Sequence, residues 1–277
     1  MLEKRLIGVI TVKDGWAVQS IGYRRHRPLG RPEVIAENLD RWGVDEILLQ
    51  CIDRDAQGGG PDLALLERLC RRGLSTPLVY AGGVRSVSDG VRAVQAGAER
   101  IGIDALLHDD PHLAAELAEP LGAQALIAVL PLSVHNGALA WLDHRSRLST
   151  PLAPALLDVL ASGAISEVLL VDWQHEGVHE GFDERLLALW PMPTLPLIAF
   201  GGLSEPSQLR GVLVLRQDTM ASLTGLRDKG IRAARFSHRS GAGGDHPHDA
   251  ARLQRLRMGQ HVGQHRSVGE EMQHLRQ

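Results

Sequence analysis

An internal repeat constrains this chain of 277 residues more than any other feature of its sequence. The segment GVDEILLQCIDRDAQGGGPDLALLERL, which begins at Gly43, resembles GAISEVLLVDWQHEGVHEGFDERLLAL, which begins at Gly163. A second match, TPLVYAGGVRSVSDGV with LPLIAFGGLSEPSQL, keeps the same offset of about 120 residues, and a constant offset is the signature of a duplicated unit. We therefore predict two similar halves, at about residues 1–121 and 122–213.

Short apolar runs alternate with helical patterns, which is typical of βαβ units with a parallel sheet. We predict strands at Arg5–Thr11, Glu46–Ile52, Leu78–Ala81, Arg100–Asp104, Ala125–Leu130, Glu167–Asp172 and Leu197–Phe200. We predict helices at Pro32–Trp42, Pro61–Arg72, Val87–Ala96, Pro111–Leu121, Ala153–Ala161, Asp183–Leu189 and Pro206–Leu213. Two halves of four strands favour a closed (βα)8 TIM barrel over an open sheet.

No eighth strand is apparent after residue 213. Residues 215–277 lack a β-branched run and hold 11 Arg/Lys against 6 Asp/Glu, in a chain whose formal net charge is −3. We predict a barrel over residues 1–213 and a flexible or loosely helical extension, rich in His, Arg and Gln, over 214–277. A shifted reading frame in the gene is the alternative, and it would leave an open barrel that aggregates.

The segment Ser133–Thr150 interrupts the alternation of strands and helices. It contains Asn136-Gly137 between apolar residues, which is a strong hairpin signal. We predict a β-ribbon that extends one of the loops between a strand and its helix.

Composition excludes several classes of protein. No apolar run approaches the roughly 20 residues of a membrane span, and the N-terminus lacks a signal-peptide cleavage site. The two cysteines, Cys51 and Cys70, do not indicate a disulfide framework. The basic extension lacks the interleaved aromatic residues of a nucleic-acid surface. We expect a cytoplasmic protein with no membrane or nucleic-acid partner.

Paired glycines follow two of the predicted strands, as Gly82-Gly83 and Gly201-Gly202. At the carboxyl end of a buried strand, glycine lets backbone N–H groups approach a phosphate closely. A tight turn with positive φ is the alternative explanation. Because the pairs recur at the same place in both halves, we favour two phosphate sites.

The segment from His175 to His179 spells H-E-x-x-H, a zinc-protease pattern that requires a helix to bring both histidines to one face. Gly177 and Gly181 interrupt this segment, and it matches a loop of the first half. We expect no zinc here, and neither a metal nor another cofactor elsewhere.

Four charged residues open predicted strands, namely Arg5, Glu46, Arg100 and Glu167. The two-residue period of a strand can point Arg5 into the barrel floor. Two arginines and two glutamates would neutralise one another there, since an unpaired buried charge is costly.

Over about residues 1–213 the sequence resembles the cyclase subunit of imidazole glycerol phosphate synthase. The segments that carry the resemblance are VKDG, GVDEILL, AGGV, GAERIGID, GAISEVLL, EGVHEGFD and IAFGGLS. The resemblance implies a (βα)8 barrel that binds a ligand with a phosphate at each end. It also implies a lyase-type cyclisation in histidine biosynthesis, with ammonia that passes through the barrel from a glutaminase partner.

The resemblance also implies roles for individual residues. Arg5, Glu46, Arg100 and Glu167 match the family's ammonia gate, with Arg100 where lysine is usual. Phosphate or substrate contacts are implied for Gly82, Gly83, Asp104, Glu176, Gly177, Gly201 and Gly202. Among these, Asp104 stands where the family has asparagine, and Glu176 stands where it has aspartate.

The family's two catalytic aspartates align with Thr11 and Leu130. Neither side chain exchanges protons near neutral pH, as general acid–base catalysis requires. Gln19 stands in place of a loop lysine, and Cys51 in place of a further aspartate. A side branch of the family, associated with amidination of surface-polysaccharide sugars, also lacks the aspartate of the first strand.

Two classes of function remain open. One is the ammonia-using cyclase, or its sugar-amidinating relative, paired with a glutaminase. The other is a non-catalytic barrel that binds a phosphorylated ligand or a glutaminase-like partner. The sequence leaves open the substrate, the pathway and the oligomeric state.

Overall fold

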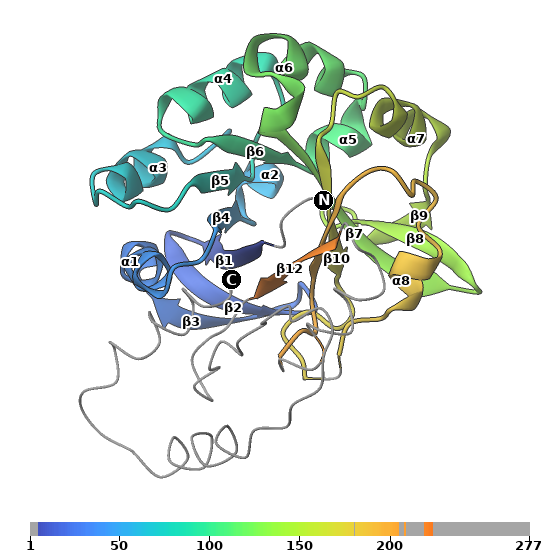
Figure 1. Cartoon of the computed structure of the whole chain (residues 1–277), viewed down its shortest axis with the longest axis horizontal. Coiled ribbons are helices and arrows are strands. Elements are labelled where there is room, and N and C mark those ends of the chain that lie inside the picture. The colour runs from blue at the N-terminus through green and yellow to red at the C-terminus, as the bar shows by residue number, and fades with distance from the viewer. Residues whose placement is uncertain (1–4, 180, 205–207, 209–218, 224–277) are drawn as a thin grey trace, which may run out of the picture.

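The structure is a computed structural model that describes residues 5–179, 181–204, 208 and 219–223 (Figure 1). Its centre is a set of parallel strands: β1 Leu6–Lys13, β4 Glu46–Cys51, β5 Leu78–Ala81, β6 Arg100–Ile103, β7 Leu126–His135, β10 Glu167–Asp172, β11 Leu197–Phe200 and β12 Thr219–Leu223. The pairing order is β10-β11-β12-β1-β4-β5-β6-β7, and β10 also pairs with β7, so the sheet closes on itself. The predicted parallel β/α barrel is confirmed.

Helices surround the barrel on its outer side (Figure 1). They are α1 Pro32–Trp42, α2 Arg54–Gln57, α3 Leu63–Cys70, α4 Val87–Gln95, α5 Ala105–Asp109, α6 Leu113–Leu121, α7 Pro154–Ala161 and α8 Arg185–Ala188, with a 3-10 turn η1 at Ala123–Ala125. Local sequence fixes their ends: α1 has Pro32 in its first turn and stops at Gly43, whose φ of 73° is left-handed. Within the described ranges, no helix is long and apolar enough to cross a bilayer.

Buried side chains form two layers that the two-residue period of the strands separates. Ile7, Val9, Leu48, Val129 and Leu169 belong to the cluster that fills the barrel interior. The intervening strand residues belong to a larger cluster between the barrel and its helices. This double burial explains why the strands read as continuous apolar runs.

Strand β12 supplies the eighth strand, which was not apparent in the sequence. It pairs in parallel with β11, where Leu197 faces Thr219, and with β1, where Leu6 faces Ala221. The sequence TMASL has one β-branched residue and no periodicity, so its neighbours and not its composition define it as a strand. Its pairing on both sides closes the barrel within the described residues.

Strand β12 lies within the segment that we assigned to the extension. The predicted helix Pro206–Leu213 lies outside the described residues, apart from Gln208. The rest of the predicted extension over 214–277 also lies outside them, so its flexible character stays a prediction.

Two antiparallel additions extend the barrel at the carboxyl ends of its strands. The predicted ribbon forms from the end of β7, β8 Ala138–Asp143 and β9 Leu148–Pro151. Its tight turn has left-handed φ at Asn136 and Gly137, as the sequence predicted. A hairpin of β2 Trp16–Ile21 and β3 Arg25–Gly30 follows β1 and was not predicted.

Candidate functional site

A ring of four alternating charges closes the amino-terminal end of the barrel. Arg5, just before β1, pairs with Glu46 of β4 and with Glu167 of β10. Arg100 of β6 lies 3.4 Å from Glu46 and 2.8 Å from Glu167. The structure thus brings together the four charged residues that stand at the starts of predicted strands. We call them the floor ring.

The two glutamates of the floor ring are buried, with 8% and 10% of their side chains exposed. Burial raises the pKa of Glu46, although Arg5 and Arg100 oppose the shift. Arg100 is also tied to the chain, because it donates to the Ser166 hydroxyl at 3.0 Å. Each buried carboxylate therefore has two guanidinium neighbours, which limits the cost of its burial.

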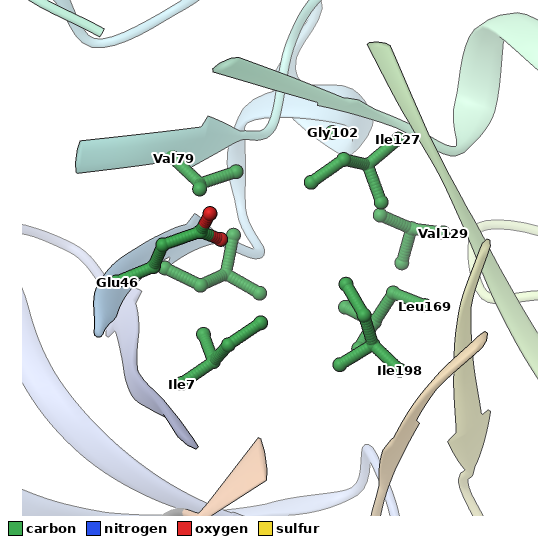
Figure 2. Close-up of a pocket in the computed structure, with 9 residues that line it drawn as sticks. Ile7, Glu46, Val79, Gly102, Ile127, Val129, Leu169 and Ile198 are labelled. Carbon is green, nitrogen blue, oxygen red and sulfur yellow. The ribbon is translucent and has the colours of Figure 1, made fainter. Parts of the chain in front are cut away.

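A small cavity lies directly inside the floor ring, in the centre of the barrel (Figure 2). It holds about 10 Å³, roughly the room that one water-sized molecule needs. Glu46 is the one charged residue in its lining, and the others are Ile7, Leu48, Val79, Gly102, Ile127, Val129, Leu169 and Ile198.

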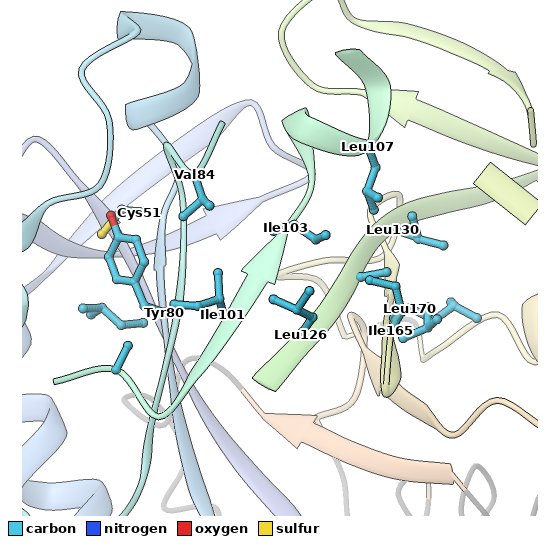
Figure 3. Packing of buried hydrophobic residues seen from close by; sticks show 14 of the residues in the cluster. Cys51, Tyr80, Val84, Ile101, Ile103, Leu107, Leu126, Leu130, Ile165 and Leu170 are labelled. Atoms are coloured by element: carbon cyan, nitrogen blue, oxygen red, sulfur yellow. The ribbon is translucent and has the colours of Figure 1, made fainter. Parts of the chain in front are cut away.

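The opposite end of the barrel, where the strands have their carboxyl ends, is called here the carboxyl-end face. Thr11 is buried at the end of β1, in register with Gln50 of β4. Leu130 does not reach this face, since it packs in the outer layer near Leu170 (Figure 3). The residue of β7 in register with the inward Val171 is Pro131. Neither Leu130 nor Pro131 carries a titratable group.

Cys51 also lies in the outer layer, beside Tyr80 (Figure 3). Burial raises the pKa of its thiol to about 12, so the thiol stays protonated near neutral pH. Gln19, which aligns with a family lysine, is half-buried in the β2–β3 hairpin. Neither residue supplies a charge to the carboxyl-end face.

The first glycine pair is packed against its own half of the chain. A Cβ on Gly82 would lie 2.2 Å from the carbonyl oxygen of Cys51, and one on Gly83 would lie 2.4 Å from that of Gly60. The Gly83 amide donates at 3.0 Å to the carboxylate of Asp55. Close backbone approach and a positive φ thus require glycine here, and the chain's own carboxylate occupies one of the two amides.

Asp55 is buried and forms a cluster with the partly buried Asp104 and His144. The Nδ1 of His144 lies 3.1 Å from a carboxylate oxygen of Asp104, and its Nε2 lies 3.9 Å from one of Asp55. Burial lowers the pKa of His144, but the two carboxylates outweigh it and raise that pKa above its ordinary value. Burial, and then repulsion from Asp104, raise the pKa of Asp55.

The ribbon carries His144 onto the face and is anchored on both sides of it. Trp141 of β8 stacks on His108 of α5, with ring centroids 3.5 Å apart. Arg145 donates to Asp143 at 3.0 Å and to Asp109 at 2.8 Å. The position of His144 is therefore set by packing and ion pairs outside the cluster.

Glu176 lies at the other side of the face and is 2% exposed. Ser20 donates to its carboxylate at 3.0 Å, and the Tyr23 amide donates at 3.3 Å. Burial raises the pKa of Glu176 to about 7 in spite of these bonds. A Cβ on Gly177, the next residue, would lie 2.1 Å from the carbonyl oxygen of Ser20, so the two loops touch.

The second glycine pair repeats the backbone packing of the first. A Cβ on Gly201 would lie 2.4 Å from the Asp172 carbonyl oxygen, and one on Gly202 would lie 2.3 Å from that of Gly181. Within this half, Asp172 accepts a bond from the Asp183 amide at 2.8 Å and contacts His175 Nδ1 at 2.6 Å. The carboxylate thus holds the loop that carries Glu176.

The H-E-x-x-H segment forms turns and not a helix, so it does not present His175 and His179 on one helix face. His175 contacts Asp172, whereas His179 is exposed. Among the residues described, no group of three or more His, Cys, Asp or Glu side chains is placed to hold a metal ion.

The β2–β3 hairpin and the ribbon meet above the barrel mouth. Tyr23, at the tip of the hairpin, has a left-handed φ of 56° and packs against the interior cluster together with Trp173. Its carbonyl accepts a bond from Arg147 of the ribbon at 2.7 Å, and the Gly22 amide donates to the Glu176 carbonyl at 2.9 Å. The two antiparallel additions therefore cover the mouth jointly.

Sequence reasoning missed Asp55 and His144. The repeat contained a signal for Asp55, because the residue 121 positions later is Glu176, which was identified. His144 had no such signal, since it has no counterpart in the other half and its position depends on how the ribbon folds back.

The family model described as "Histidine biosynthesis protein" matches residues 5–225. Three similar proteins all carry the name "Imidazole glycerol phosphate synthase subunit HisF". The protein from Natranaerobius thermophilus is 27% identical over 205 residues, covering 73% of this chain and 81% of the relative. The protein from Proteus mirabilis is 30% identical over 216 residues, 75% and 83% of the two chains. The protein from Hyphomonas neptunium is 31% identical over 206 residues, 73% and 81%.

Proposed function

Because this chain belongs to the histidine biosynthesis protein family, we propose that it is an ammonia-using barrel that acts with a glutaminase partner on a phosphorylated ligand. Ammonia enters through the floor ring, crosses the barrel interior and reaches the ligand at the carboxyl-end face. The reaction is the family's lyase-type cyclisation or the related amidination of a sugar. The relatives are named as a synthase subunit, which supports this choice of reaction.

The single observation that carries this proposal is the floor ring together with the cavity inside it. Arg5, Glu46, Arg100 and Glu167 alternate in charge around the entrance. Behind them lies an apolar space with room for one water-sized molecule. Such a path suits neutral ammonia, because an ammonium ion would lose its hydration among apolar side chains.

On the carboxyl-end face we propose Glu176 as the group that exchanges protons with the ligand. Its pKa of about 7 fits general acid–base chemistry near neutral pH, which neither Thr11 nor Leu130 can provide. Gly177, Gly201 and Gly202 are proposed to bind a phosphate beside it, through backbone N–H groups.

The direct test is turnover with an ammonium salt as the nitrogen source. The whole chain is incubated with the family's doubly phosphorylated ligand and, separately, with a singly phosphorylated sugar. Ammonium-dependent consumption of either ligand, lost in Glu176→Gln, is the expected result. Consumption that does not depend on ammonium would contradict the proposal.

A second experiment tests the floor ring. With a glutaminase partner present, Arg5→Ala should lower glutamine-dependent turnover at least about tenfold and spare ammonium-dependent turnover, because ammonia from bulk solution does not depend on transfer from the partner at the floor ring. Arg72→Ala, which breaks the exposed pair with Glu37, is the matched control and should change neither rate.

A non-catalytic barrel is the second candidate, and two observations favour it. Leu130 and Pro131, where β7 pairs with the last residues of β10, carry no titratable side chain, and Tyr23 packs against the interior cluster of the barrel. Binding of a phosphorylated ligand or of a glutaminase, without ammonium-dependent turnover of any ligand, is the outcome that supports this candidate.

A further inference from the structure

The two glycine pairs are alike in backbone packing but differ in what their loops do. In the first half, the Asp55 carboxylate lies directly on the glycine pair and accepts the Gly83 amide at 3.0 Å. The equivalent residue 121 positions later is Glu176. Its carboxylate instead accepts bonds from Ser20 and from the Tyr23 amide, both in the β2–β3 hairpin region. Among the described residues, it forms no bond to Gly202.

A second carboxylate, that of Asp104, lies at the same end of the carboxyl-end face as Asp55, which we call the first-half end. Asp104 follows β6, next to the first glycine pair, and one of its oxygens is fully buried with no hydrogen-bond partner among the described residues. His144 lies between Asp104 and Asp55, at 3.1 and 3.9 Å. Even with His144 protonated, two carboxylates and one imidazolium leave a net charge of −1.

The neighbouring cations do not make the net charge of this end positive. Arg85 donates its Nη2 to the Asp55 carbonyl at 3.0 Å, and its charge also opposes the rise in the pKa of Asp55, so counting it brings the net charge to zero but not above zero. Burial lowers the pKa of His108, which favours its neutral form beneath Trp141. A phosphate placed at the Gly83 amide would displace the Asp55 carboxylate and face Asp104 in a region that water screens poorly.

We infer that the carboxyl-end face takes a ligand that carries a phosphate at one end only, at the second glycine pair. The first-half end, formed by Asp55, Asp104 and His144, selects an end that carries hydroxyl groups and no phosphate. Carboxylate oxygens accept hydrogen bonds from sugar hydroxyls, whereas they repel phosphate oxygens. This inference rests on the proposed function, because it assumes that the face binds a phosphorylated ligand.

Calorimetric titration of the whole chain tests the inference with two probes that differ in their end groups. Ribose 5-phosphate carries one phosphate, and ribulose 1,5-bisphosphate carries one at each end. We expect ribose 5-phosphate to bind at least about tenfold more tightly, since each pair of like charges at short range opposes binding. Equal or tighter binding of the bisphosphate would overturn the inference and leave the proposed function intact.

The double variant Asp55→Ser/Asp104→Asn removes both charges and vacates the Gly83 amide. The preference for ribose 5-phosphate should then disappear, and its persistence would overturn the assignment to these carboxylates. Glu116→Gln/Glu119→Gln removes two charges from the exposed side of α6, and it should keep the preference. If neither probe binds the unaltered chain, the proposed function fails together with the inference. The unaltered chain alone decides the question if the double variant does not fold.

Discussion

Burial of Glu176 beside the β2–β3 hairpin shifts the pH at which its carboxyl group ionises. With a pKa of about 7, the group is largely protonated at pH values where an exposed glutamate is charged. The cause is desolvation, since Ser20 and the Tyr23 amide favour the ionised form and only partly offset it. The Glu176 side chain can therefore exchange protons near neutral pH. Its ionisation also lowers the stability of the fold.

Replacing Glu176 with glutamine tests the sign of this effect. Between the unfolded pKa of about 4.3 and the folded pKa of about 7, the folded chain holds a proton that the unfolded chain has lost, so stability falls as pH rises. Glutamine cannot ionise. Glu176→Gln should raise Tm by about 7–14 °C at pH 8, which corresponds to about 3.5 kcal/mol, and change it little at pH 4. An equal Tm shift at both pH values would contradict the assigned pKa.

Gly83 offers a second test at the level of one residue. Its φ of 71° is left-handed, and a Cβ would lie 2.4 Å from the Gly60 carbonyl oxygen. Gly83→Ala should therefore destabilise the fold by at least about 2 kcal/mol in chemical denaturation. Gly15 has a φ of 76° but no atom within 4 Å of a Cβ, so Gly15→Ala should cost only about 1 kcal/mol. Similar costs for both would mean that φ alone, and not the contact, demands glycine.

Among the elements, the ribbon differs most from the rest of the barrel, because it carries a histidine onto the face. Trp141 and Arg145 anchor it beside α5. His144 then depends on where β8 and β9 fold back, which no local pattern reveals.

The contribution of His144 to the stability of the ribbon should depend on pH. Its pKa is raised in the folded chain, so the stabilisation is complete below about pH 6.5 and is lost as pH rises through the folded pKa. His144→Gln should cost about 1–2 kcal/mol at pH 6 and less at pH 9. Chemical denaturation at both pH values measures this. A cost that grows with pH would show that His144 is held in its neutral form.

The elements that the sequence predicted share a physical cause. β4 and β10 are buried on both faces, so their apolar runs identify them without reference to distant contacts. β3 has arginines and a proline on an exposed edge, and β12 is defined by pairing with β1 and β11. Such elements depend on partners far along the chain and leave no local pattern.

The residues of the candidate site also divide into those that a local pattern predicts and those that only distant contacts bring together. The floor ring was predictable because each member stands at the start of a predicted apolar strand, where opposite charges can neutralise one another. Leu130 shows where an alignment of residues fails, because a shift of one position moves a side chain from the interior to the outer layer. The cluster around His144 combines residues from three separate loops, and only the folded chain brings them together.

At the scale of the molecule, closure of the barrel depends on five residues. β12 is the only described segment that joins β11 to β1. Ala221→Pro removes a backbone N–H from this ladder, and it should expose two strand edges. Hydrogen exchange in β1 and β11 should rise at least about tenfold, with self-association in size-exclusion chromatography. Ala221→Ser keeps the N–H group and should behave as the unaltered chain, and unchanged exchange in the proline variant would mean that β12 does not close the barrel.

The packing of the glycines also bears on how a chain like this can be rearranged by recombination. Gly82 and Gly83 fit against Cys51 and Gly60, which belong to the first half. Gly201 and Gly202 fit against Asp172 and Gly181, in the second half. A crossover near Gly122, between the halves, would separate none of these four glycines from its partner. The contacts of these four glycines therefore stay within their own half, whereas the contact of Gly177 with the Ser20 carbonyl oxygen joins the two halves and would have to be matched when halves are exchanged.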